Sequence, residues 1–193
     1  MPGLWRILLT LLVVFPFSPA QEAHDHRVPE RLGKVSFPIS CKPAVQEQFD
    51  RGVALLHSFA YPAAEGAFQD VARVDPRCAM AHWGVAMAYF HQLWDPPLVP
   101  ETIPMAQKEI QRAQQMGAGS ERERQFIHAL GLIFQDSATV PYGTRALNYE
   151  HAMGDLAREN GKDVEVQVFY ALALLANASP HDKTHAKQKQ AAD

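Results

Sequence analysis

The stretch Gly52–Phe90 reads GVALLHSFAYPAAEGAFQDVARVDPRCAMAHWGVAMAYF, and its pattern of small and aromatic residues recurs after 34 positions. The residues related by this period are Phe49 and Trp83, Gly52 and Ala86, Ala54 and Ala88, Leu55 and Tyr89, Leu56 and Phe90, and His57 and His91. A fixed period is typical of stacked structural units, and small residues two apart on successive helices let their backbones approach closely. The stretch therefore predicts helical hairpins that lie side by side.

The ladder of small residues returns twice more along the chain, at Ala129 with Gly131 and at Ala171 with Ala173. The step from residue 86 to 129 is 43 positions and the step from 129 to 171 is 42, so these units are longer by 9 and 8 residues. Insertions of this kind are expected in loops, where they leave the stacking intact. We predict an all-α fold, a right-handed superhelical solenoid of helix-turn-helix repeats with about three and a half hairpins over residues 43–193.

Prolines and glycines mark the expected helix ends, because proline is tolerated only in the first turn and glycine relieves strain at a C-terminus. Ser120 followed by Glu121 and Glu123 is typical of a capped helix start. The expected helices cover residues 43–59, 62–74, 78–93, 104–116, 121 onward, and 142–159.

The first twenty residues are typical of a secretory signal peptide. Arg6 provides a basic start, residues 7–17 are nearly all apolar, and Ser18-Pro19-Ala20 offers a cleavage site. An uncleaved N-terminal anchor is the alternative, although an apolar run of about 11 residues is short for a bilayer. We expect export to a periplasm or the cell exterior, with no membrane association after cleavage.

Residues 21–42 are expected to form an extended lead-in to the helices. Val35, Phe37 and Ile39 alternate with polar residues, as in an extended segment that lies on a surface, and we expect it to cap the first hairpin. Cys41 and Cys78 flank the first hairpin, and an exported chain could oxidise them to a disulfide. Two separate buried thiols are the alternative, because free cysteine packs like a small hydrophobe.

The period and its residues resemble the tetratricopeptide repeat, a helical hairpin with small residues at two fixed points, a later aromatic residue and a closing proline. The matching positions are Gly52, Ala64, Phe68 and Pro76 in the first unit, Ala86, Tyr89, Ala106, Ile110 and Ala113 in the second, and Ala129 and Ala146 in the third. Glu150 stands where the third unit would have an aromatic residue. The resemblance covers residues 43 to about 190.

A closer resemblance rests on three strings: Phe37-Pro-Ile-Ser-Cys41, His57-Ser-Phe59, and Asp75-Pro-Arg-Cys-Ala-Met-Ala-His-Trp-Gly84. They look like a family of exported bacterial tetratricopeptide proteins with no assigned biochemical role, whose members are usually longer. This resemblance implies that the chain could be an N-terminal fragment of a longer repeat protein, truncated at its C-terminus.

The tetratricopeptide family binds peptides on the inner face formed by the first helix of each hairpin. In this register, the residues expected near that face are Phe49, Leu56, Trp83, Met87, Phe90, Phe126 and Ile133. An exposed apolar and aromatic surface would mark a binding site for a protein or peptide. Core packing is the alternative, with the groove filled by the protein's own chain.

Other functions have less support in the sequence. His57, His82 and His91 are candidate metal ligands, but no cysteine or carboxylate pattern completes a site, so no cofactor is expected. The chain lacks the familiar signatures of metalloproteases, serine hydrolases and nucleotide-binding loops, and we expect a scaffold, with a cryptic or metal-dependent enzyme as the alternative. Its 18 basic and 21 acidic residues give a net charge of -3, which argues against binding to nucleic acid.

Overall fold

The computed structural model describes residues 31–94 and 97–192, so the predicted signal peptide and the first part of the lead-in lie outside the described residues. The regular secondary structure of the described ranges is entirely helical, which confirms the all-α prediction. The α-helices are α1 (Gln46–His57), α2 (Tyr61–Val74), α3 (Ala79–Met87), α4 (Ile103–Met116), α5 (Glu121–Phe134), α6 (Tyr142–Glu159), α7 (Val164–Ala176) and α8 (Ala186–Gln190), and the short 3-10 helices are η1 (Pro43–Val45) and η2 (Pro100–Thr102).

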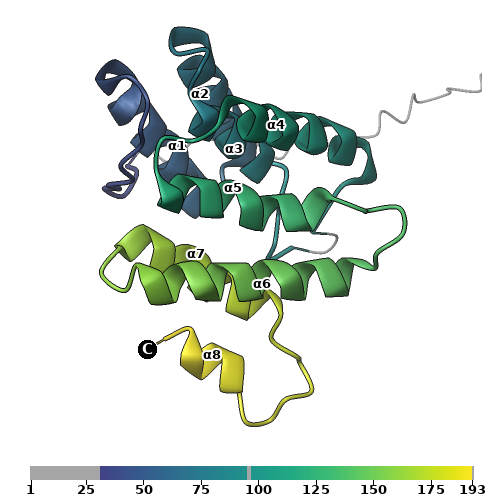
Figure 1. Ribbon diagram of the computed structural model, residues 1–193. Coiled ribbons are helices and arrows are strands. Elements are labelled where there is room, and N and C mark those ends of the chain that lie inside the picture. The colour runs from purple at the N-terminus through teal and green to yellow at the C-terminus, as the bar shows by residue number, and fades with distance from the viewer. Residues whose placement is uncertain (1–30, 95–96, 193) are drawn as a thin grey trace, which may run out of the picture.

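Each helix packs against the next one along the chain, from α1 on α2 to α7 on α8. The odd-numbered helices also contact one another, α1 with α3 and α3 with α5. Figure 1 shows the helices stacked in chain order, with α1 to α4 at one end and α8 beside the C-terminus at the other. Neighbouring hairpins therefore share one continuous core.

The small residues of the first two units accommodate an aromatic ring. Phe68 of α2 is fully buried between Gly52 of α1 and Gly84 of α3. A Cβ atom at Gly52 would lie 2.6 Å from the Phe68 ring, and one at Gly84 would lie 2.3 Å from it. Both distances are shorter than carbon atoms tolerate, so glycine at these two positions lets three helices close around one ring.

Most helix ends lie near the expected positions. The predicted cap of α5 is a full capping box, in which the Ser120 hydroxyl accepts from the Glu123 N–H and the Glu123 carboxylate accepts from the Ser120 N–H. The third helix is shorter than expected, because α3 ends at Met87 instead of near residue 93. The N–H of His91 donates to the carbonyl of Pro97 and no longer to a helix carbonyl, so the chain has already turned away.

Residues 31–42, named the strap below, are extended and run into η1. Their alternation is confirmed: Phe37 is fully buried, Val35 and Ile39 are half-buried, and the residues between them are exposed. Among the described residues, no helix combines the length and the apolar character that a membrane crossing requires.

Candidate functional site

The side chain of Phe37 is fully buried in a cluster of aromatic rings. Its ring centre lies 5.4 Å from that of Phe49 in α1, 5.5 Å from Trp83 in α3, 5.0 Å from Phe126 in α5 and 6.3 Å from Phe169 in α7. These four rings come from the first helix of each successive hairpin. The strap therefore does more than cap the first hairpin, because Phe37 touches all four units at once.

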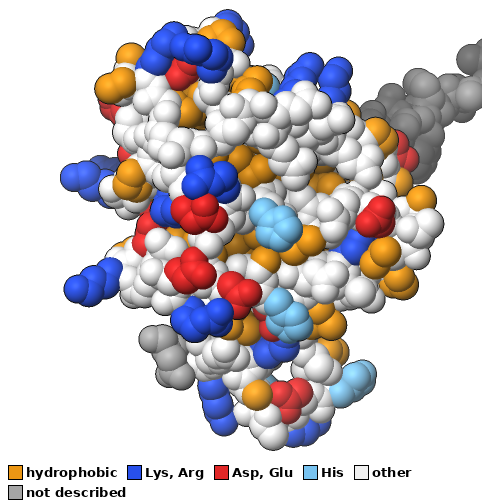
Figure 2. All heavy atoms as spheres, viewed as in Figure 1, with side chains coloured by type: hydrophobic (Ala, Val, Ile, Leu, Met, Phe, Trp, Pro, Cys, Tyr) orange, Lys and Arg blue, Asp and Glu red, His pale blue; other side chains and the backbone are white. Residues whose placement is uncertain are grey.

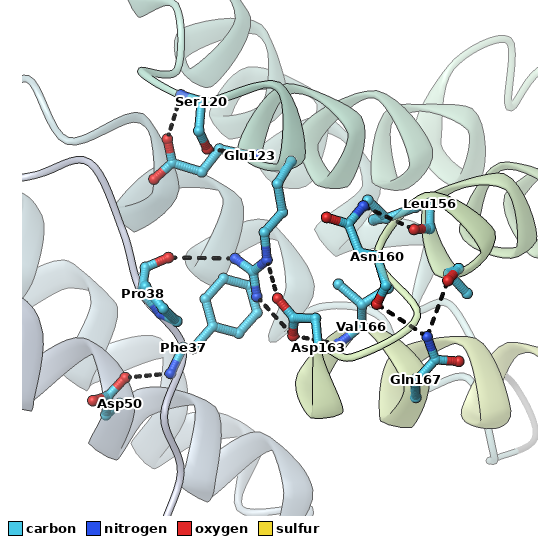
Figure 3. Close-up of polar contacts among 12 residues, drawn as sticks. Phe37, Pro38, Asp50, Ser120, Glu123, Leu156, Asn160, Asp163, Val166 and Gln167 are labelled. Carbon is cyan, nitrogen blue, oxygen red and sulfur yellow. Dashed lines mark hydrogen bonds and ion pairs between the residues drawn. The ribbon is translucent and has the colours of Figure 1, made fainter.

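The main chain of the strap is hydrogen-bonded to side chains of α1. The Phe37 N–H donates to Asp50 Oδ1 at 2.9 Å, as Figure 3 shows. The side-chain amide of Gln46 makes two bonds to the strap: its Nε2 donates to the Phe37 carbonyl at 2.8 Å and its Oε1 accepts from the Ile39 N–H at 3.2 Å. Gln46 thus pairs with the strap as a neighbouring strand would.

Arg122 of α5 holds the strap from the opposite side. Its guanidinium donates to the Asp163 carboxylate at 2.6 and 3.3 Å and to the Pro38 carbonyl at 3.3 Å. The same group lies over the face of Phe37, which is a cation–π contact. Asp163 also caps α7 by accepting from the Val166 N–H (Figure 3). This set of bonds connects the strap to α5 and α7.

Glu123 binds the strap with the carboxylate that closes the α5 capping box. Its Oε1 accepts from the Ser40 N–H at 2.5 Å while its Oε2 accepts from Ser120. The turn before α5 passes close to the strap here, since a Cβ at Gly119 would lie 2.5 Å from the Cβ of Ser40. Glu123 is buried, so both of its oxygens are shielded from water.

The C-terminal end of the strap is fixed to the turn between α2 and α3. Cys41 and Cys78 form a disulfide in the structure. The Lys42 N–H donates to Asp75 Oδ2 at 2.9 Å, and this bond lowers the pKa of the Asp75 carboxyl below its ordinary value. The segment from 37 to 42 is thereby bonded through main-chain and side-chain atoms along its whole length.

A further polar contact joins the first and last helices that surround Phe37. His57 Nε2 of α1 lies 2.8 Å from Glu165 Oε2 of α7, and the His57 ring lies 5.3 Å from that of Phe169. The first and last hairpins therefore meet, and the inner face that they form with α3 and α5 is covered by the strap.

The seven residues expected at a partner-binding face are all buried. The exposed fraction of each is at most 6%, and the set comprises Phe49, Leu56, Trp83, Met87, Phe90, Phe126 and Ile133. In this structure the strap and the neighbouring helices cover these residues, so no open groove is present here. Their role in binding a partner stays a prediction.

The three candidate metal ligands do not come together. His57 pairs with Glu165, His82 Nδ1 lies 2.5 Å from Glu109 Oε2, and His91 Nε2 donates to the Ala88 carbonyl. The described part of the chain contains no group of three or more histidine, cysteine or acidic side chains arranged to hold a metal ion. Each imidazole has a hydrogen-bond partner of its own.

The polar residues that hold the strap were not predicted from the sequence. Gln46, Asp50, Arg122 and Asp163 are ordinary polar residues of helices and helix ends, and nothing in their spacing indicates a common contact. Glu123 was predicted to cap α5, but the bond between its other oxygen and the Ser40 N–H was not predicted. No motif or spacing in the sequence signals this second contact.

The arrangement is suited to holding an extended polypeptide, since carboxylates accept its N–H groups, Gln46 and Arg122 donate to its carbonyls, and four aromatic rings enclose one side chain. On the face seen in Figure 2, acidic and basic side chains are intermixed. No family model, curated protein or solved structure matches the chain.

Proposed function

We propose that this protein is an exported scaffold of tetratricopeptide-like repeats that binds an extended polypeptide on its inner face, and that the strap occupies this face in cis. The observation that carries the proposal is the position of Phe37, which is fully buried among rings from four hairpins while its N–H and carbonyl are bonded to α1 side chains. We infer that the function is protein or peptide binding.

The order of the helices supports the repeat interpretation. Consecutive antiparallel hairpins, contacts between the odd-numbered helices and small residues that recur after 34 positions are all expected of a tetratricopeptide solenoid. The inner face of such a solenoid is lined by the first helix of each hairpin. The four rings around Phe37 come from these helices, α1, α3, α5 and α7.

The contacts of the strap define what a competing ligand would need. Main-chain groups of Phe37, Pro38, Ile39 and Ser40 are bonded to side chains, and every extended peptide carries such groups. Selectivity would come from the pocket of Phe37, which accepts one large aromatic side chain. We propose an extended peptide with a phenylalanine-like residue as the ligand class.

Export agrees with the chemistry of the strap. The bond between Cys41 and Cys78 fastens the strap to the α2–α3 turn, and disulfides persist in oxidising compartments. Together with the signal-like first twenty residues, this supports a location in a periplasm or outside the cell.

The proposal is tested by converting the strap into a separate peptide within the folded protein. A protease site is inserted between Lys42 and Pro43, both of which are exposed, and the oxidised full chain is cut there. The disulfide retains the cut strap until a reductant is added and the strap is released. Calorimetry then measures the binding of a synthetic peptide of residues 31–42 to the protein without its strap.

We expect the reduced, cut protein to stay helical and to bind the synthetic peptide reversibly. A peptide with Phe37→Ala should bind more than about a hundredfold more weakly, because Phe-to-Ala changes in a packed core typically cost about 3–5 kcal/mol. If both peptides bind equally, or if the helices unfold once the strap leaves, the inner face is not a peptide-binding groove and the proposal fails.

A further inference from the structure

A hollow of about 470 Å³ lies away from the strap, and no strap residue lines it. It is formed by the turn between α1 and α2, the first turns of α2 and the segment that follows α3. The lining residues are Phe59, Tyr61, Pro62, Glu65, Ala88, Tyr89, His91 and Trp94. Its volume is in the range of ligand pockets, about 300–1,000 Å³, and aromatic rings make up most of its wall.

Two of these rings are unusually exposed for their size. The exposed fraction is 42% for Phe59 and 53% for Trp94, and the two rings meet edge to face with centres 5.6 Å apart. Tyr61 adjoins Phe59 at 6.3 Å and stacks on His91 at 4.0 Å. The four rings therefore form a connected aromatic wall that is already assembled without a ligand, and apolar surface of this kind marks a binding site.

The backbone presents Phe59 at this wall in a strained conformation. Its N–H donates to the Leu56 carbonyl and the next N–H, of Ala60, donates to the Leu55 carbonyl, which is the hydrogen-bond pattern of a Schellman helix end. The residue after such a helix end is usually glycine, because this position requires a positive φ. Here it is Phe59, whose φ is 57°. A large aromatic residue is thus kept where the helix end favours glycine.

The charge of the hollow is negative. Glu65 supplies the one carboxylate of its lining, and its Oε1 accepts from the Tyr89 hydroxyl at 2.6 Å. Burial lowers the pKa of His91, whose Nε2 donates to the Ala88 carbonyl, so the imidazole is neutral at pH 7. Burial raises the pKa of both Tyr61 and Tyr89, so the phenols stay neutral as well.

We propose that this hollow, lined by Phe59, Tyr61, His91 and Trp94 with Glu65 at its wall, binds a trimethylammonium group. Aromatic faces attract a cation through their quadrupoles, and methyl groups make apolar contact with the same rings. A primary ammonium is less suited, since it is more strongly hydrated and would need several acceptors, whereas the lining supplies one carboxylate. The site lies apart from the strap and does not depend on the proposed peptide groove.

The test uses the full chain, and its probes are choline and the uncharged carbon isostere of choline, in which a tert-butyl group replaces trimethylammonium. Calorimetry measures affinity, and the indole N–H signal of Trp94 in the NMR spectrum, assigned with Trp94→Phe, reports the location. We expect saturable binding of choline that shifts this signal, and no saturable binding of the isostere.

Three variants make the test specific. Trp94→Ala should weaken choline binding about two- to fivefold, the size expected for the loss of a cation–π contact at a partly exposed site. Glu65→Gln keeps a partner for the Tyr89 hydroxyl but removes the charge, so it should also weaken binding. Leu147→Ala, which truncates another exposed apolar residue, on α6, should leave binding unchanged.

The source of the group is identified with two further probes, a peptide that contains trimethyllysine and a phosphatidylcholine vesicle. If the peptide binds more tightly than choline, the source is a methylated protein. If the vesicle binds more tightly than choline, the source is a lipid headgroup. If neither does, the source is a free small cation. The proposal is overturned if the isostere binds as well as choline, if Trp94→Ala and Leu147→Ala have equal effects, or if choline leaves the Trp94 signal unchanged across the millimolar range.

Discussion

The guanidinium carbon of Arg122 lies 4.1 Å from the centre of the Phe37 ring, so a cation on α5 covers the aromatic side chain that the strap inserts between four hairpins. Asp163 orients this guanidinium, since both of its carboxylate oxygens accept from it. Arg122 thus links the strap, α5 and the start of α7. The strength of this link can be measured.

Arg122→Lys should lower the free energy of unfolding by about 1–3 kcal/mol. Lysine keeps the charge but cannot make the forked contact with Asp163 or lie flat on Phe37. Urea denaturation followed by circular dichroism measures the change. The matched control is Arg124→Lys, two positions along, because Arg124 makes an exposed pair with Glu121 and its replacement should change stability by less than about 0.5 kcal/mol. Equal effects of the two substitutions would contradict the role given to Arg122.

Phe37→Ala should destabilise the protein by about 3–5 kcal/mol, because it removes a fully buried ring and leaves a cavity. Its exposed neighbour gives the control, and Ser36→Ala should stay within about 0.5 kcal/mol of the wild type. Denaturant titration of both variants makes the comparison. A loss below about 1 kcal/mol for Phe37→Ala would mean that the strap is peripheral to the core.

Two glycine substitutions should have opposite signs. Gly84→Ala places a Cβ 2.3 Å from the buried Phe68 ring, so we expect the free energy of unfolding to fall by about 1–3 kcal/mol or more. Gly66→Ala, in the middle of α2, meets no atom within 4 Å and should raise stability by about 0.5–1 kcal/mol through helix propensity alone. Thermal melts of the two variants decide the matter, and a stabilising Gly84→Ala would refute the close packing around Phe68.

The contribution of Asp75 should depend on pH in the acid range. The N–H of Lys42 holds its pKa below the ordinary value of 3.8, so the folded state binds a proton less readily than the unfolded state. The resulting stability is fully present above pH 3.8 and is lost as the pH falls through the lower folded pKa. The gap in unfolding free energy between the wild type and Asp75→Asn should therefore be widest at neutral pH and narrow towards about pH 2.

The control for this experiment is Asp70→Asn, in an exposed pair with Arg73 on α2. Denaturant titrations at several pH values should show a gap for Asp75→Asn that closes in acid and no comparable change for Asp70→Asn. A gap for Asp75→Asn that stayed constant over the same range would show that the carboxylate charge does not contribute.

The helices and their order could be predicted from the sequence because the signals are local. The period of 34, the capping residues at Ser120 and Glu123 and the alternation at Phe37 each depend on a few neighbouring residues. The end of α3 was misplaced because it depends on a contact of His91 with the carbonyl of Pro97, across the loop. Local propensity does not report such a contact.

The candidate site was only partly predictable, for a similar reason. The aromatic residues of the inner face, such as Phe49 and Trp83, followed from the repeat register, but the register does not say whether solvent, a partner or the chain itself covers them. The residues that decide this, Gln46, Asp50 and Arg122, act through single hydrogen bonds to a strap distant in sequence. Their roles emerge only in three dimensions.

The strap also has a consequence for the order in which the protein folds. Repeat hairpins contact mainly their neighbours and can form one after another, since closing short loops has a small entropic cost. Phe37 is synthesised before any of the helices, yet its last aromatic neighbour, Phe169, belongs to the last long helix. The inner aromatic face therefore stays incomplete during synthesis, and docking of the strap is expected to be the late, long-range step that limits the folding rate.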